Sequence, residues 1–138
     1  MSGRASVSGG AGVPDGAGPV STDEPVLVVI SADPRTSHRA FEALRIGVGI
    51  VAGENEVTFV LAGGAVHLLD DDTDALVDGD DIAKFRSTLR TMGVAFHVEA
   101  SVAPQDDPDW NVERHPIVTV SREEIAALAC RARRALVF

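Results

Sequence analysis

The sequence is short of cysteine, of long apolar runs and of clustered positive charge, and each shortage excludes a class of protein. Its single cysteine, Cys130, cannot form an internal disulfide bond, which fits a reducing compartment. No apolar stretch reaches the roughly 18 residues that a membrane-spanning helix needs. The first residues hold one arginine and no apolar core, so they do not resemble a secretory signal. We therefore expect a cytoplasmic protein that does not enter a membrane.

The charge is negative and unevenly distributed. The formal net charge is −9, and residues 25–138 carry 18 acidic against 11 basic side chains. Binding to nucleic-acid phosphates needs clustered cations, so we expect no nucleic-acid partner. Seven of the acids fall between residues 70 and 81, in a run without lysine or arginine.

This acidic run has some of the spacing of a calcium-binding loop. However, Ala75 stands where such a loop requires glycine, and Asp81 stands where it requires a bidentate glutamate. We predict a solvated acidic loop with no bound metal. Nothing in the sequence predicts a cofactor.

Composition divides the chain into a tail and one domain. Residues 1–24 hold 6 of the 13 glycines and few residues large enough to pack, which predicts a flexible Gly/Ser-rich tail. Residues 25–138 are long enough to bury a core without disulfides or a metal.

The apolar pattern of that domain predicts five strands. Residues 25–33 and 56–62 contain continuous apolar runs, typical of strands covered on both faces. Shorter strands are expected at residues 94–99, 117–120 and 135–138. Helices or crossovers separate the strands, so we predict a three-layer α/β/α fold with a five-stranded, mainly parallel sheet.

Three helices are expected between the strands. The first should be capped by Thr36 or Ser37 and end at Gly53, with Gly47 and Gly49 packed closely on the sheet. The second should span about residues 80–92.

The third helix should follow a capping box formed by Ser121 and Glu124. The residues expected to share its apolar face are Ile125, Leu128, Ala129 and Ala132.

Ligands of open parallel sheets bind at the carboxyl ends of the strands, and polar residues follow two of the predicted strands there. Arg35, Thr36 and Ser37 follow the first strand and form a candidate anion site at a helix start, against the alternative of an ordinary capped helix. His97 and Glu99 share one face of the third strand, with Ser101 beyond them. They form either a candidate acid–base pair or a polar pair at an interface.

Two further residues leave alternatives open. Cys130 is the only candidate thiol nucleophile, but it falls on a helix, so a structural or incidental thiol is the competing interpretation. Trp110, in the irregular connection of residues 102–115, could cover the core or touch a partner.

The segment from Val26 to Leu69, which includes Ala40, Ala43-Leu44, Gly64 and Val66, resembles the opening of DsrE/DsrF/TusC-type sulfur-relay proteins. The likeness continues through IAKFRSTLRTMGVAFHVEAS and REEIAALACRARRALVF, so it covers nearly all of residues 25–138. It implies a DsrE-like α/β fold and assembly into homo- or hetero-oligomers with DsrE-like subunits. Members of the family pass persulfide sulfur between proteins.

The chain departs from that family at one important position. Sulfur-carrying members have a cysteine just after the third strand, where this chain has Glu99, and a carboxylate cannot hold or release a sulfur atom. We therefore expect a non-catalytic subunit or interaction module of a sulfur-relay type assembly, without a complete catalytic site. The alternatives are a small-ligand binder or enzyme that uses Glu99 and the Arg35 turn, and a sulfur carrier that uses Cys130.

Overall fold

The computed structural model describes residues 25–138, so the predicted tail of residues 1–24 lies outside the described residues. Five strands form one sheet in the order β4-β3-β2-β1-β5. The strands are β1 (Val26–Ile30), β2 (Val57–Leu61), β3 (Phe96–Glu99), β4 (Ile117–Val120) and β5 (Arg134–Val137). All four pairings between neighbouring strands are parallel, which confirms the predicted fold class.

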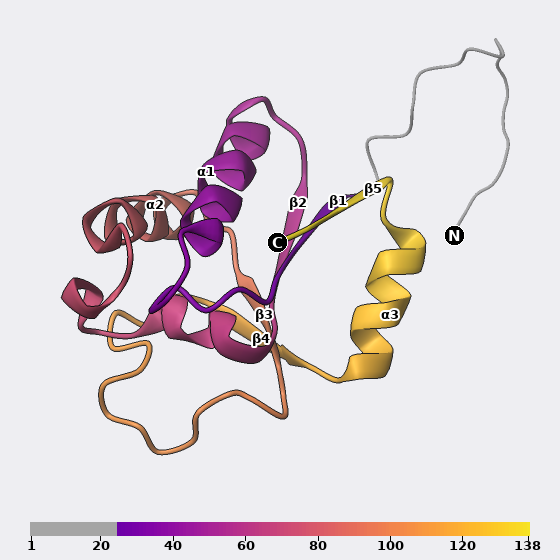
Figure 1. Ribbon diagram of the computed structural model, residues 1–138. Coiled ribbons are helices and arrows are strands. Elements are labelled where there is room, and N and C mark those ends of the chain that lie inside the picture. Colours follow the sequence, from indigo (N-terminus) through magenta and orange to yellow (C-terminus); the bar gives the residue numbers. More distant parts are fainter. Residues whose placement is uncertain (1–24) are drawn as a thin grey trace, which may run out of the picture.

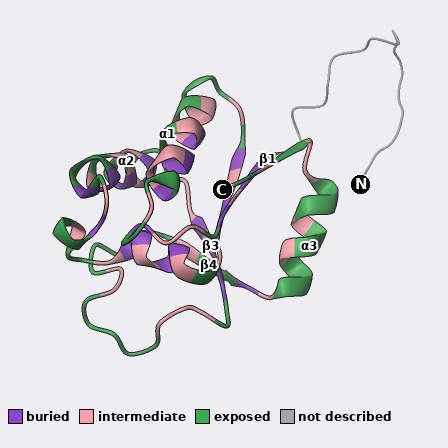
Figure 2. Ribbon diagram, in the orientation of Figure 1, coloured by how far each residue is buried: buried purple, intermediate pink, exposed green. Residues whose placement is uncertain are grey.

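The helices divide unequally between the two faces of the sheet (Figure 1). One face is covered by α1 (Arg39–Ala52), α2 (Gly79–Thr91) and the 3-10 helix η1 (Gly63–Leu69). Among the helices of residues 25–138, α3 (Arg122–Arg131) alone lies on the other face. Figure 2 shows the same inequality in burial, because α1 and α2 have buried stripes whereas α3 has no buried residue.

The hydrophobic core lies on the α1/α2 side of the sheet. The register aligns Phe59 with Phe96, and the two rings meet edge to face with centroids 5.6 Å apart. Gly47 of α1 is buried directly over Phe59, as predicted for close packing on the sheet. The same prediction is wrong for Gly49, because no atom lies within 4 Å of the position that its Cβ would take.

The helix ends agree with the sequence only in part. The capping box of α3 is confirmed, with Glu124 N–H donating to Ser121 Oγ over 3.1 Å and Ser121 N–H donating to Glu124 Oε1 over 2.8 Å. The helix α1 begins at Arg39, and Ser37 Oγ accepts from Arg39 N–H over 3.1 Å, so one of the two predicted capping residues bonds the first helical amide. Residues 34–36 form a turn closed by Asp33, and this turn delays the helix.

The predicted apolar face of α3 is less buried than expected. Ile125, Leu128 and Ala132 are half-buried, and Ala129 is exposed. The helix α3 has only ten residues and lies on the five-stranded sheet without a neighbouring helix among the described residues. Part of its apolar face therefore stays uncovered.

The irregular connection before β4 is docked onto η1. Trp110 Nε1 donates to the Val66 carbonyl over 2.8 Å, and the indole packs against the core. Asn111 N–H donates to the Leu69 carbonyl over 2.7 Å. Of the two roles considered for Trp110, covering the core is therefore the one observed. No helix among the described residues is long and apolar enough to cross a membrane.

Candidate functional site

The carboxyl edge of the sheet brings together three segments that are far apart in the sequence. The strands β3, β2 and β1 are neighbours, so their ends meet along one edge. Glu99 ends β3, Gly63 and Gly64 follow β2, and the turn containing Arg35 follows β1. Ligands of open parallel sheets bind at the carboxyl ends of the strands, so this edge is the candidate site.

Glu99 is the most buried acidic residue described on this edge, with 8% of its surface exposed. Its Oε1 accepts a hydrogen bond from Gly63 N–H over 3.3 Å, and its Oε2 accepts from Arg122 Nε over 3.2 Å. Arg122 is the first residue of α3, so the capping box that starts this helix also fixes the position of the arginine. The side chain of Arg122 is 86% exposed, so solvent screens the ion pair from one side.

Glu99 stays ionised although it is buried, because hydrogen bonds stabilise the carboxylate. Burial acts to raise the pKa of the carboxyl group, but the hydrogen bonds from Arg122, Gly63 and Ser101 outweigh it and hold the pKa below its usual value. Glu99 is therefore ionised at neutral pH and is a poor proton donor there. Its oxygens can accept hydrogen bonds or attract a cation, but they cannot carry a transferable sulfur atom.

The turn after β1 forms a second carboxylate–arginine pair. Asp33 Oδ2 accepts from Arg35 Nη2 over 2.8 Å, and Asp33 Oδ1 accepts from the Arg35 amide over 2.9 Å. The hydrogen bonds from Arg35 are the main cause of a lowered pKa for Asp33. The amides of Thr36 and Ser37 both donate to the Asp33 carbonyl, over 3.1 and 3.0 Å. An external anion would therefore have to displace partners that these donors already have.

The glycine pair after β2 lies between the two carboxylates. Gly63 N–H is bonded to Glu99, and Gly64 packs so closely on Asp33 that an added Cβ would lie 2.8 Å from Asp33 Cβ. Gly63 also has a φ of 53°, a left-handed conformation that favours glycine. The two glycines therefore allow both acidic side chains to approach the end of β2.

The hollow beside Glu99 is small. It has a volume of about 230 Å³ and is lined by Glu99, Ala100, Ser101, Ser121, Arg122 and Glu123. Pockets that bind small molecules usually have volumes of about 300–1,000 Å³. This region is better suited to holding the end of β3 against the start of α3 than to enclosing a substrate.

His97 lies on the same face of β3 as Glu99 but belongs to a different hollow. Its ring lies with Val118, Val120 and Leu128 in a space of about 290 Å³ between the sheet and α3. Its Nδ1 is buried and has no hydrogen-bond partner among the described residues. Burial lowers the pKa of His97. No hydrogen bond joins His97 to Glu99 within residues 25–138, so the structure does not assemble the predicted acid–base pair as a contact.

Cys130 is exposed and lies near the end of α3. Arg122, which contacts Glu99, begins the same helix, eight residues earlier. At 1.5 Å per residue, the two positions are about 12 Å apart along the helix axis. The only thiol in the chain is thus separated from the carboxyl edge where the resemblance would place it.

Three residues of this edge, Asp33, Gly63 and Arg122, were not among the candidate site residues that the sequence predicts. Arg122 was visible inside the capping box, but its pairing with Glu99 depends on the parallel register of β3 and β4. Asp33 stands two residues before Arg35, a spacing that suits a turn in which the side chain bonds the backbone two residues on. Within residues 25–138, no group of three or more His, Cys, Asp or Glu side chains could hold a metal ion.

Comparison with known proteins gives a structural likeness only. No family model matches the chain, and the comparison with curated protein sequences gives no match either. Its structure is similar to the crystal structure of the YchN protein from E. coli, with a TM-score of 0.64 and 17% sequence identity. The alignment covers 83% of this chain and 99% of YchN. YchN has a DsrE-like fold, and the likeness shows that this chain has that fold too.

Proposed function

We propose that this protein is a non-catalytic subunit of a sulfur-relay type assembly, built on a DsrE-like fold. The observation that carries the proposal is Glu99 at the end of β3. Sulfur-carrying members of the DsrE/DsrF/TusC-type family, which the sequence resembles, have a cysteine at that position. Glu99 is paired with Arg122 and bonded to Gly63, so it joins α3 to the sheet, and within residues 25–138 no thiol lies at that edge. The fold is compatible with this role, and the chemistry of the edge is not that of a sulfur carrier.

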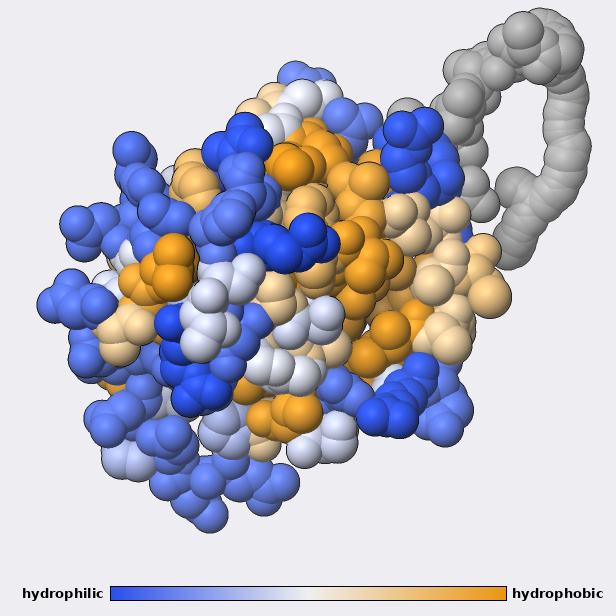
Figure 3. All heavy atoms as spheres, in the orientation of Figure 1, coloured by the Kyte–Doolittle hydropathy of each residue, from blue (hydrophilic) through white to orange (hydrophobic). Residues whose placement is uncertain are grey.

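Assembly requires a surface for another subunit, and the sheet face beside α3 supplies one. The exposed valines Val118 and Val137 lie on the two edge strands, with 45% and 67% of their surface exposed. The register places Val118 beside His97 and Val137 beside Val29, so both valines belong to the face that α3 covers incompletely. Figure 3 shows apolar side chains gathered between α1 and α3, where Figure 1 places β5.

We propose that this partly covered face, defined by Val29, Val118, Val137 and α3, contacts a second DsrE-like subunit. Exposed apolar side chains on the face of a sheet are a common feature of such contacts. The strand β5 is also an edge strand, so no other strand of residues 25–138 pairs with its outer hydrogen-bonding groups, and another chain could pair with them.

Light scattering coupled to size-exclusion chromatography tests the proposal on the full chain, alone and mixed with candidate relay subunits. We expect an oligomer or a mixed complex for the natural sequence, and dissociation for Val137→Lys and Val118→Lys. Val112→Lys is the matched control, because Val112 is 50% exposed but lies in the connection before β4. It should leave the assembly intact.

Two results would count against the proposal. The first is a monomer at all concentrations that binds none of the relay subunits. The second is equal dissociation by all three lysine variants, which would point to a general effect of added charge. A cysteine desulfurase assay in parallel should show no transfer of sulfur to the chain, as required of a non-catalytic subunit.

A further inference from the structure

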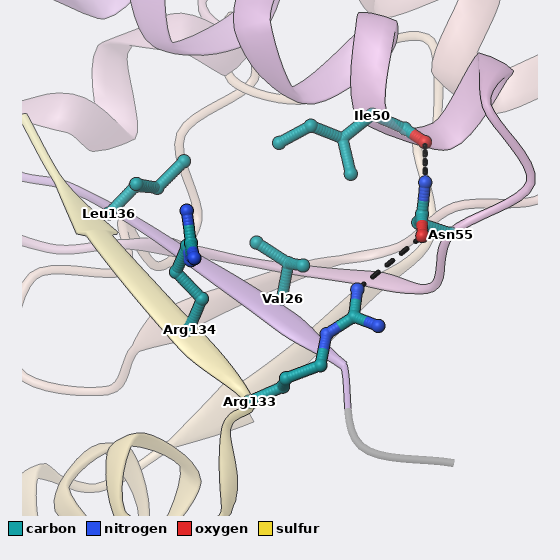
Figure 4. A pocket seen from close by; sticks show the side chains of 6 residues that line it. All are labelled: Val26, Ile50, Asn55, Arg133, Arg134 and Leu136. Carbon is teal, nitrogen blue, oxygen red and sulfur yellow. Dashed lines mark hydrogen bonds between the residues drawn. The ribbon is translucent and has the colours of Figure 1, made fainter. Parts of the chain in front are cut away.

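A cavity of about 500 Å³ opens at the amino end of the sheet, opposite to the edge that carries Glu99. It lies between the end of α1 and the first residues of β1 and β5 (Figure 4). The lining residues are Val26, Ile50, Asn55, Arg133, Arg134 and Leu136. Its volume falls within the range of about 300–1,000 Å³ that is usual for small-molecule sites.

The lining combines an apolar wall with two arginines. Val26, Ile50 and Leu136 form the wall, and Figure 4 shows both guanidinium groups near it. The register pairs Arg134 with Val26, so Arg134 stands on the core side of the sheet, in line with Leu136. Arg134 therefore places a positive charge at the border of the apolar core.

Neither arginine has a carboxylate partner within residues 25–138, although the chain is strongly acidic. The ion pairs of the described residues involve other basic side chains, namely Arg35, Arg45, His67, Arg86, Arg90 and Arg122. Glu54 and Glu56 flank Asn55 in the sequence, yet neither forms an ion pair with Arg133 or Arg134.

The arginines are also not needed to cap α1. The carbonyl of Ile50 already accepts from Asn55 Nδ2 over 3.3 Å and from Gly53 N–H over 3.1 Å. The carbonyl of Val51 accepts from Glu54 N–H over 2.9 Å. Asn55 in turn offers its Oδ1 to Arg133 Nη2 over 3.4 Å, so the helix end orients one guanidinium (Figure 4).

We propose that this cavity binds a small organic oxyanion with an apolar body, such as an aromatic carboxylate or phosphate ester. Arginine presents a planar fork of donors that matches the oxygens of carboxylates and phosphates. In this arrangement Arg133 and Arg134 hold the oxyanion, and Val26, Ile50 and Leu136 contact the apolar body. The cavity lies on the α1 side of the sheet and the proposed subunit contact lies on the α3 side, with β5 bordering both. The binding proposal does not require the assembly role.

Nuclear magnetic resonance titration of the full chain tests the proposal with four probes: phenyl phosphate, 4-ethylbenzoate, inorganic phosphate and benzyl alcohol. We expect one or both of the organic anions to shift the amide signals of Val26, Asn55 and Leu136. Which of the two binds more tightly decides between a phosphate and a carboxylate headgroup. Inorganic phosphate lacks the apolar body and benzyl alcohol lacks the charge, so both should bind at least tenfold more weakly.

Matched variants separate a built site from general attraction. Arg134→Gln and Arg133→Gln should each weaken binding about tenfold, because each removes a charge-assisted hydrogen bond. Arg131→Gln removes the same charge from the exposed end of α3, outside this cavity, and should leave the affinity unchanged. Arg134→Lys preserves the charge without the fork and should bind with intermediate affinity.

The proposal is overturned by three results. One is the absence of shifts at these three amides with either organic anion at millimolar concentration. The second is equal weakening by Arg131→Gln, which would show diffuse electrostatic attraction only. The third is equal affinity for inorganic phosphate and phenyl phosphate, which would remove the role of the apolar wall. Unchanged backbone spectra of the free variants confirm that any loss of affinity reflects the lost side chain.

Discussion

Replacing Glu99 by glutamine preserves the size of the side chain but removes the charge that joins β3 to α3. Glutamine can still accept from Gly63 N–H through its carbonyl oxygen. Its amide group, however, is a donor and would face Arg122 Nε, which is also a donor. The substitution therefore breaks the contact with Arg122 and weakens the charge-assisted character of the contact with Gly63.

The expected loss of stability is modest. A charge-assisted hydrogen bond contributes about 1.5–3 kcal/mol when both groups are shielded from water. Arg122 is 86% exposed, and exposed ion pairs are worth about 0–1 kcal/mol, so the contribution must be discounted. We expect Glu99→Gln to lower the free energy of unfolding by about 1 kcal/mol, or the melting temperature by about 4 °C for a domain of this size.

The pH dependence identifies the charge as the cause. The pKa of Glu99 is lower in the folded chain than its ordinary value of 4.5. The ionised carboxylate therefore contributes its full stability above pH 4.5, and this contribution is lost as the pH falls through the folded pKa. The difference between the natural chain and Glu99→Gln should be largest at neutral pH and should shrink in acid.

Urea unfolding followed by the fluorescence of Trp110, the only tryptophan, measures this difference across the pH range. Comparing two chains removes the contributions of Asp33 and Glu113, whose pKa values are also lowered. Glu56→Gln is the control, because Glu56 is exposed and forms no ion pair within residues 25–138. A deficit that stays constant from neutral to acidic pH would refute the reasoning.

Three further predictions concern other parts of the fold. Arg86→Met should destabilise the domain by about 2–4 kcal/mol in urea unfolding, because Arg86 is buried and donates to two backbone carbonyls of the segment that leads into the acidic loop; a loss below 1 kcal/mol would contradict this. Gly47→Ala should lower the free energy of unfolding by about 1–3 kcal/mol, because the added methyl group collides with Phe59. Gly49→Ala, in open space, should raise it by about 0.5–1 kcal/mol. Calorimetry that gave both changes the same sign would argue against the packing described. Incubation with a cysteine desulfurase and a sulfur donor should leave the intact mass unchanged, and a sulfur adduct absent from Cys130→Ser would instead establish that exposed Cys130 is a carrier.

The sequence predicts well those elements whose burial or capping is determined by residues close together in the chain. The continuous apolar runs in β1 and β2 are buried on both faces, as such runs indicate. The capping box of α3 is local and was predicted to the residue. The position of Glu99 at the end of β3 followed from the alternation of polar and apolar residues, and the register confirms that His97 and Glu99 share a face.

The contacts of the site could not be predicted in the same way. Glu99 and Arg122 are 23 residues apart, and their meeting depends on the pairing of β3 with β4. Glu99 bonds Gly63 and Arg122 and not His97, and no local pattern in the sequence places these two partners beside it. The arginine cavity was missed for a similar reason, because Arg134 borders an apolar layer only once β5 pairs with β1.

The pairing of β1 with β5 has a further consequence for the order of folding. Ser31 N–H donates to the Phe138 carbonyl over 2.9 Å, a contact between residues 107 positions apart. Closing so long a loop is entropically costly, so this strand pair should form after the local pairs. Within the sheet of the described residues, β5 also has a neighbour on one side only. In a native-state hydrogen-exchange experiment, the amides of β5 should therefore exchange first among the five strands. The arginine cavity and the proposed subunit contact would both open with this strand, so the least protected strand of the sheet is shared by the two surfaces to which we assign partners.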